Sequence, residues 1–332
     1  MSRRARVAGP SNIKKMELVV GGSIAAASIA GVFKFGRYPN GPVAALPGEV
    51  PAVDSVVTLD ASGGPTRYRH WSGRGGPLVV LIPGISYPME CYTPLFEVLK
   101  AAGHSVLMYD VTGRGYSHSS GEPMTASLLV RQLNELLAAL NLGNDEMHLI
   151  GWSMGTVVAT HFCDRFPERV ARLVLLGPVG AVTANKPATA KLIHAPLGIG
   201  NALATLVMPG ALQKLYRAEL DAHPIVDFLC DHASRNTGLV RAMVSTLRNC
   251  PELDDNRACL ARLGEQARVP ILVMWATKDG TVSRHGIDEM MRLLGGDANS
   301  NARLVVISGE RHGFFMTRPD EVHPHVLGFL DE

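Results

Sequence analysis

Cysteine is scarce in this sequence, and its cysteines are not spaced as metal ligands or redox pairs. The 332 residues include five cysteines, with no C-x-x-C pair and no Cys/His cluster of zinc spacing. The odd number disfavours a disulfide framework, so buried free thiols are expected, with a pair among Cys230, Cys250 and Cys259 open only in an oxidising compartment. No metal and no cofactor are predicted.

Charged residues are also few, at 19%, and the net charge of +2 is unevenly distributed. Up to Arg37 there are seven basic residues and one acid, so this segment carries +6 and the rest of the chain −4. Nucleic-acid binding needs a basic face, which the body of the chain lacks, so no nucleic-acid partner is expected. The 46% of apolar residues can form a large core, which disfavours global disorder.

The sequence has no apolar run as long as a typical membrane-spanning helix, but a shorter apolar run lies near the N-terminus. Residues 18–33 are uncharged, 16 in number, against the roughly 17 to 20 that a spanning helix needs. A membrane anchor is the preferred interpretation, which predicts a membrane-associated protein. The alternatives are a cleaved signal peptide, a mitochondrial presequence and a soluble tail. A signal peptide would imply secretory-pathway targeting, and a presequence would imply mitochondrial targeting. Residues 1–48 are assigned to this basic segment and its linker.

Strand and helix patterns alternate from residue 54 onward. Residues 54–71 predict a β-hairpin, and continuous apolar runs such as "PLVVLIPG" predict buried strands. Thr125 is a plausible cap of the helix that follows it. The prediction is an α/β fold with a mostly parallel sheet, helices on both faces and an inserted helical lid. The expected division is core over 49–179 and 268–332, and lid over 180–267, where no strand pattern occurs.

Three reactive side chains follow predicted strands. They are Ser153 in "GWSMG", Asp279 in "WATKDGTV" and His312 in "SGERHGF". The carboxyl ends of parallel strands meet at one edge of a sheet, so these residues should converge there. A serine hydroxyl needs a base to become a nucleophile, a histidine can be that base, and an aspartate can orient the imidazole. The sequence therefore predicts Ser153 as nucleophile, His312 as general base and Asp279 as its partner.

Acyl transfer through a serine also needs two N–H donors for the oxyanion that develops. The residue after the nucleophile, Met154, supplies one at the start of a helix. Ile85, in the loop after "VVLIPG", is the expected second donor. The tight turns around these residues are assigned to three glycines: Gly84, Gly151 and Gly155.

These motifs, together with "YDVTGRGYS" at residues 109–117, resemble those of the lid-bearing α/β-hydrolases, which include monoglyceride lipases, esterases and C–C hydrolases. The resemblance covers residues 54–332 and implies a Ser–Asp–His hydrolase. The last motif is interpreted as structural, with Gly113 and Gly115 in a tight turn. The chain departs from the family in having Pro83 where a histidine is usual. Some members take the acid from the preceding strand, but "VLLGPVG" contains none, which favours Asp279.

The leading hypothesis is a serine hydrolase that cleaves a carboxylic ester of a moderately hydrophobic small molecule or lipid through an acyl-enzyme. An acyltransferase or a C–C hydrolase would use the same triad. A catalytically silent binding protein with the hydrolase fold is the alternative from another class, and the intact set of three residues argues against it.

Overall fold

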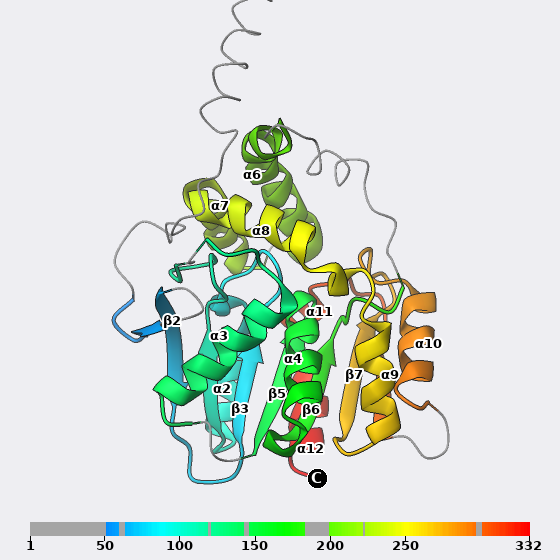
Figure 1. Cartoon of the computed structure of the whole chain (residues 1–332). Coiled ribbons are helices and arrows are strands. Elements are labelled where there is room, and N and C mark those ends of the chain that lie inside the picture. The colour runs from blue at the N-terminus through cyan, green and yellow to red at the C-terminus, as the bar shows by residue number, and fades with distance from the viewer. Residues whose placement is uncertain are drawn as a thin grey trace, which may run out of the picture.

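The computed structural model describes residues 51–59, 64–118, 121–142, 146–182, 199–221, 223–296 and 301–332. Its centre is one sheet with helices on both sides and further helices over one end (Figure 1). The predicted anchor at residues 18–33 lies outside the described residues. Within the ranges given above, no helix has both the length and the apolar character that crossing a membrane requires.

The sheet has eight strands in the order β1-β2-β4-β3-β5-β6-β7-β8. The β1–β2 and β2–β4 pairs are antiparallel, and all the others are parallel, which confirms the predicted fold class and the hairpin at its edge. The bounds are β1 (Ser55–Leu59), β2 (Gly64–Trp71), β3 (Leu78–Ile82), β4 (Ser105–Tyr109), β5 (Met147–Trp152), β6 (Val170–Leu176), β7 (Ile271–Ala276) and β8 (Ala302–Ile307).

The register of the parallel strands brings their carboxyl ends to one edge. Trp152 at the end of β5 pairs with Leu176 at the end of β6. Leu176 in turn pairs with Met274 of β7, and Ala276 of β7 pairs with Ile307 of β8. Loops that leave these strands therefore begin side by side, and this edge is where such sheets bind ligands.

Two hydrophobic cores follow from the alternation of side chains along the strands. Val80 and Ile82 of β3 face one core, and Val79 and Leu81 face the other. The Thr125 hydroxyl accepts a hydrogen bond from the Leu128 N–H at 3.1 Å, which confirms its predicted role as a helix cap. The first core is filled by side chains of α3 (Ala126–Ala139), α4 (Met154–Arg165), α9 (Arg257–Gln266) and α10 (Arg284–Leu293). The second core is filled by side chains of α2 (Thr93–Ala101), α11 (Phe314–Thr317) and α12 (Pro319–Leu330).

Three helices between β6 and β7 lie together beyond one end of the sheet, and we call them the cap helices (Figure 1). They are α6 (Ile199–Leu220), α7 (Ile225–Arg235) and α8 (Thr237–Asn249). The sequence predicted an interrupted segment here, but α6 continues through Pro209. Its last turns carry Leu212, Tyr216 and Leu220 into the second core, so the cap helices are packed onto the sheet domain.

Candidate active site

Ser153 occupies the turn between β5 and α4, and its backbone is strained. Its φ of 53° and ψ of −119° lie in a region that residues other than glycine rarely adopt. The Ser153 N–H donates to the Leu176 carbonyl at 3.0 Å. The Thr156 N–H and hydroxyl both donate to the Ser153 carbonyl, at 2.9 and 2.6 Å. This sharp strand-to-helix turn is the geometry that presents a nucleophile at the edge of a sheet.

The predicted glycines lie where this turn leaves no room for a side chain. A Cβ atom on Gly151 would collide with the Gly155 carbonyl, and one on Gly155 would collide with the Ile82 carbonyl of β3. A Cβ atom on Gly84 would lie 3.1 Å from the Trp152 ring and 3.5 Å from the Ser153 Cβ. The two glycines of "GWSMG" therefore allow α4 to start directly against the end of β3.

Asp279 and His312 form a hydrogen-bonded pair beside this turn. Asp279 Oδ2 lies 2.8 Å from His312 Nδ1, and its carboxylate is fully buried. The other oxygen, Oδ1, accepts from the N–H groups of Thr281 and Val282 at 2.7 and 2.8 Å. These two N–H donors fix the orientation of the carboxylate, so Oδ2 accepts a hydrogen bond from His312 Nδ1. The proton therefore lies on Nδ1, and Nε2 is left as the acceptor.

His312 lies against Trp152, the residue before Ser153, and against Gly177 just beyond the end of β6. The Trp152 indole donates to the His312 carbonyl at 3.1 Å, and the two rings are 5.5 Å apart. A Cβ atom on Gly177, the residue after Leu176, would lie 3.0 Å from the imidazole. His312 Nε2 is buried and has no hydrogen-bond partner among the residues described. The base thus has its orienting partner in place and one unpaired nitrogen, as a resting general base can have.

The two predicted oxyanion donors flank the same turn. Met154 is the first residue of α4, where helix N–H groups lack intrahelical acceptors. Ile85 lies in the loop after β3. Over the ranges that the structure covers, neither backbone N–H donates to another protein group. Both are therefore available to an oxygen that gains charge beside Ser153.

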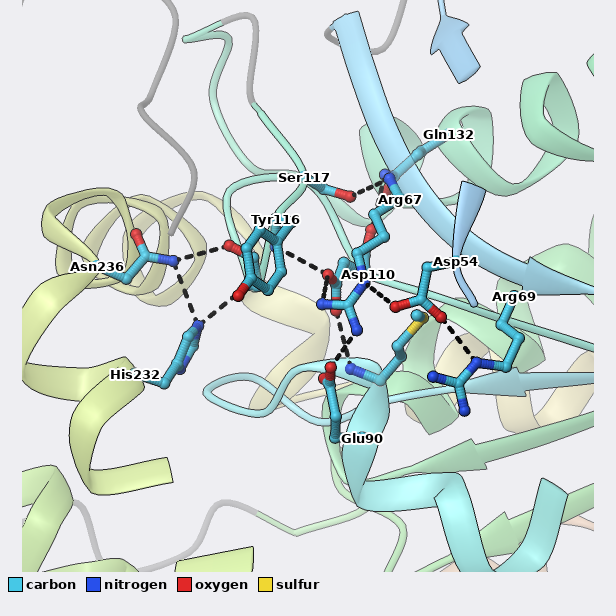
Figure 2. Close-up of polar contacts among 12 residues, drawn as sticks. Asp54, Arg67, Arg69, Glu90, Asp110, Tyr116, Ser117, Gln132, His232 and Asn236 are labelled. Atoms are coloured by element: carbon cyan, nitrogen blue, oxygen red, sulfur yellow. Dashed lines mark hydrogen bonds and ion pairs between the residues drawn. The ribbon is translucent and has the colours of Figure 1, made fainter. Parts of the chain in front are cut away.

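Residues 110–117, here called the DVTGRGYS loop, are held to the sheet domain through their first residue, Asp110 (Figure 2). Asp110 accepts from the N–H groups of Met89 and Tyr116, each at 2.8 Å, and pairs with Arg67 at 3.1 Å. Arg67 is fully buried and also pairs with Asp54 and Glu90. A Cβ atom on Gly115 would collide with the Asp110 carboxylate, and the φ of Gly115 is 51°, which agrees with its predicted place in a tight turn.

The cap helices hold the same loop from the other side. His232 Nε2 accepts from the Gly115 N–H at 3.1 Å, and Asn236 donates to the Gly115 carbonyl at 3.1 Å (Figure 2). Burial lowers the pKa of His232 to about 4, so the ring is neutral near pH 7 and can accept this bond. The loop therefore has fixed contacts with both the sheet domain and the cap helices.

Two residues of α6 that the sequence analysis did not single out reach the site. The Glu219 carboxylate accepts from the backbone N–H of His312 at 3.0 Å. The Tyr216 hydroxyl donates to the Ser86 carbonyl, one residue beyond Ile85, at 2.8 Å. Neither residue belongs to a motif, so no local signal could have identified it. In the described residues, no group of three or more His, Cys, Asp or Glu side chains could hold a metal ion.

Comparison with known proteins places most of this chain in one family model. The model described as "Serine aminopeptidase, S33" matches residues 76–318. Polyketide synthase ThaQ of Burkholderia thailandensis is 29% identical over 286 residues, which are 82% of this chain and 13% of that protein. Methylesterase 7 of Arabidopsis thaliana is 33% identical over 110 residues, which are 33% of this chain and 42% of that protein. The chain thus spans less than half the length of either relative.

The solved structures share the fold at low sequence identity. An esterase from Exiguobacterium antarcticum superposes with a TM-score of 0.68 at 18% identity, over 84% of this chain and 99% of its own. At this identity the likeness concerns the arrangement of strands and helices alone.

Proposed function

The chain belongs to the serine aminopeptidase S33 family of α/β-hydrolases, and on that premise we propose that it cleaves a carboxylic ester of moderately hydrophobic character through an acyl-enzyme. The observation that carries the proposal is the strained turn at Ser153, whose preceding residue Trp152 contacts His312 of the Asp279–His312 pair. In the described residues, the N–H groups of Ile85 and Met154 donate to no other protein group. We further assign it to the lid-bearing, monoglyceride lipase-like branch, because the cap helices contact both the His312 loop and the loop after β3.

In the proposed reaction, Ser153 Oγ attacks the ester carbonyl carbon while its proton passes to His312 Nε2. The carbonyl oxygen takes the negative charge and accepts from the N–H groups of Ile85 and Met154. His312 then returns the proton to the departing alcohol oxygen, and the acyl group stays on Ser153. Water attacks the acyl-enzyme by the same sequence, with His312 again as base, and releases the acid. Asp279 stabilises the imidazolium at both stages without itself taking the proton.

A moderately hydrophobic ester is proposed because Tyr216 and Leu220 of α6 pack in the same core as Trp152, next to Ser153. The names of two similar proteins, a methylesterase and an esterase, are consistent with ester chemistry. Transfer of the acyl group to an acceptor other than water, and C–C cleavage, would use the same residues.

The test of this proposal is labelling with a fluorophosphonate, which reacts readily with an activated serine hydroxyl. Wild-type protein should be labelled at Ser153, with loss of the label in S153A and retention in Ser234→Ala, an exposed serine on α7. A panel of p-nitrophenyl esters and monoacylglycerols, with an amino-acid p-nitroanilide as the amide arm, then gives the substrate class. Absence of label and of turnover in folded protein would favour the silent binding protein.

We also propose that residues 18–33 attach the protein to a membrane. Removing residues 1–48 should move the protein from the carbonate-washed membrane pellet to the soluble fraction and leave ester hydrolysis unchanged, because the first strand of the sheet begins at Ser55. The full-length variant Ile24→Arg should also leave the pellet, since a central arginine costs about 3 kcal/mol of insertion free energy.

Two results would contradict the anchor. Full-length protein in the soluble fraction would show that residues 18–33 do not hold it to a membrane. Loss of folding in the truncated protein, measured by circular dichroism, would show that the N-terminal segment packs on the domain.

A further inference from the structure

Arg114 is a buried cation whose burial no ion pair accounts for. Its side chain is fully inaccessible, and within the described residues no carboxylate pairs with it. Arg67, the other fully buried arginine of this region, has three carboxylates around it. Burying an unpaired charge is costly. The cost suggests that the positive charge of Arg114 serves some purpose other than folding.

The guanidinium is held by neutral acceptors from three parts of the chain. Nε donates to the Ile85 carbonyl at 3.0 Å, one Nη to the Thr112 carbonyl at 2.8 Å, and the other Nη to the Thr246 hydroxyl of α8 at 2.7 Å. That second Nη also lies 3.8 Å from the sulfur of Met154. Arg114 therefore touches both residues whose N–H groups are the proposed oxyanion donors.

The contact with Ile85 fixes the direction of the loop that carries the first donor. Ile85 has its carbonyl held by Arg114, and the next residue, Ser86, has its carbonyl held by Tyr216 of α6. Two consecutive peptide groups after the Ile85 N–H are thus anchored, one by the DVTGRGYS loop and one by a cap helix. Figure 2 shows the contacts that hold the DVTGRGYS loop at both ends of its turn: Asp110 accepts from Tyr116 and pairs with Arg67 of the sheet domain. His232 and Asn236 of the cap helices bond to Gly115.

We propose that Arg114 is the positioning residue of the oxyanion hole, and that its unpaired charge favours the negative oxygen of the tetrahedral intermediate; this rests on the proposed hydrolase function. Burial lowers the pKa of Arg114 to about 10, and the side chain stays protonated at neutral pH. In the interior a fixed positive charge acts more strongly than in water. The ground-state ester is neutral, so the charge stabilises the intermediate more than the substrate, which is the condition for raising kcat.

The test separates transition-state stabilisation from folding and from substrate binding. An alkyl trifluoromethyl ketone forms a charged tetrahedral adduct with Ser153 and reports on the oxyanion hole, whereas KM for an ester reports mainly on the ground state. Arg114→Gln should lower kcat/KM by about a hundredfold and lower the affinity for the ketone by the same factor. KM for the ester should stay nearly unchanged. Arg114→Lys should lose less, because it keeps the charge but not the planar fork. Arg262→Gln, which removes an exposed pair with Asp164, is the control and should change none of these.

A folded Arg114→Gln protein with wild-type kcat/KM and wild-type affinity for the ketone would overturn the assignment. A fall in kcat/KM without a matching loss of affinity for the ketone would also overturn it, because a merely structural role would act that way. Should the glutamine variant fail to fold, Arg114→Lys carries the same paired measurement. A wild-type protein that neither hydrolyses esters nor reacts with fluorophosphonate would instead contradict the proposed function.

Discussion

Replacing Ser153 by alanine should lower kcat for ester hydrolysis by about a million-fold. The substitution removes the atom that attacks the carbonyl, so no acyl-enzyme can form. The residual rate over the uncatalysed reaction should come from the N–H groups of Ile85 and Met154 and from substrate binding. KM should change little, since the hydroxyl contributes mainly to the covalent step. Steady-state kinetics with a p-nitrophenyl ester, on protein freed of contaminating esterases, measure the loss.

The S153A protein should remain folded. The turn is held through the Ser153 N–H and carbonyl, which alanine retains, and the positive φ strains alanine about as much as serine. The melting temperature should therefore stay within a few degrees of wild type. Ser234→Ala, on the exposed side of α7, is the matched control and should keep full activity. Ordinary esterase activity in S153A would end the acyl-enzyme mechanism.

Replacing His312 by alanine should lower kcat by a similar factor, about a million-fold. Without the imidazole, no group can accept the Ser153 proton, and none can return it to the leaving alcohol. Asp279→Asn should be milder, at about ten-thousand-fold, because His312 stays in place and loses only its tautomer and the charge that stabilises its protonated form. The two losses in kcat therefore distinguish the base, His312, from the residue that orients it, Asp279. The same ester assay measures kcat for both variants.

Controls distinguish this loss from unfolding. His312→Ala leaves the buried Asp279 carboxylate with its two backbone N–H donors but without its imidazole, so some loss of stability is expected. His312→Gln keeps an amide N–H donor at the position of the ring and should be as inactive but more stable. His285→Gln, on the exposed side of α10, should be fully active. An active His312→Gln enzyme would contradict the role of His312 as base.

The pattern of apolar residues along the sequence was sufficient to predict the strands of the sheet and the helices that cover it. The strands β3, β5 and β7 lie in the apolar runs "PLVVLIPG", "EMHLIGW" and "ILVMWATKD". These runs were recognisable because strands buried on both faces carry apolar side chains at nearly every position. The same reasoning predicted that Ser153, Asp279 and His312 would leave strands at one edge. The structure brings Asp279 and His312 to 2.8 Å, and the Trp152 indole beside Ser153 contacts the His312 carbonyl.

Strand order and the course of α6 required the tertiary structure. The place of β4 between β2 and β3 depends on pairing between residues far apart in the chain, which leaves no local trace. Pro209 and Gly210 predict a break, yet α6 runs continuously from Ile199 to Leu220. Packing of Leu212, Tyr216 and Leu220 against the second core can outweigh the hydrogen bond that a proline removes.

By itself, the sequence determined the fold class and predicted the three residues of the proposed triad, because both follow from apolar runs and short local motifs. Only the tertiary structure showed that Arg114, in a loop predicted to be structural, contacts Ile85 and Thr246, which lie 29 and 132 positions away. It also showed that Glu219 bonds the His312 N–H across 93 positions. Such contacts depend on how separate elements pack, and a single chain carries no periodic or spacing signal for that packing.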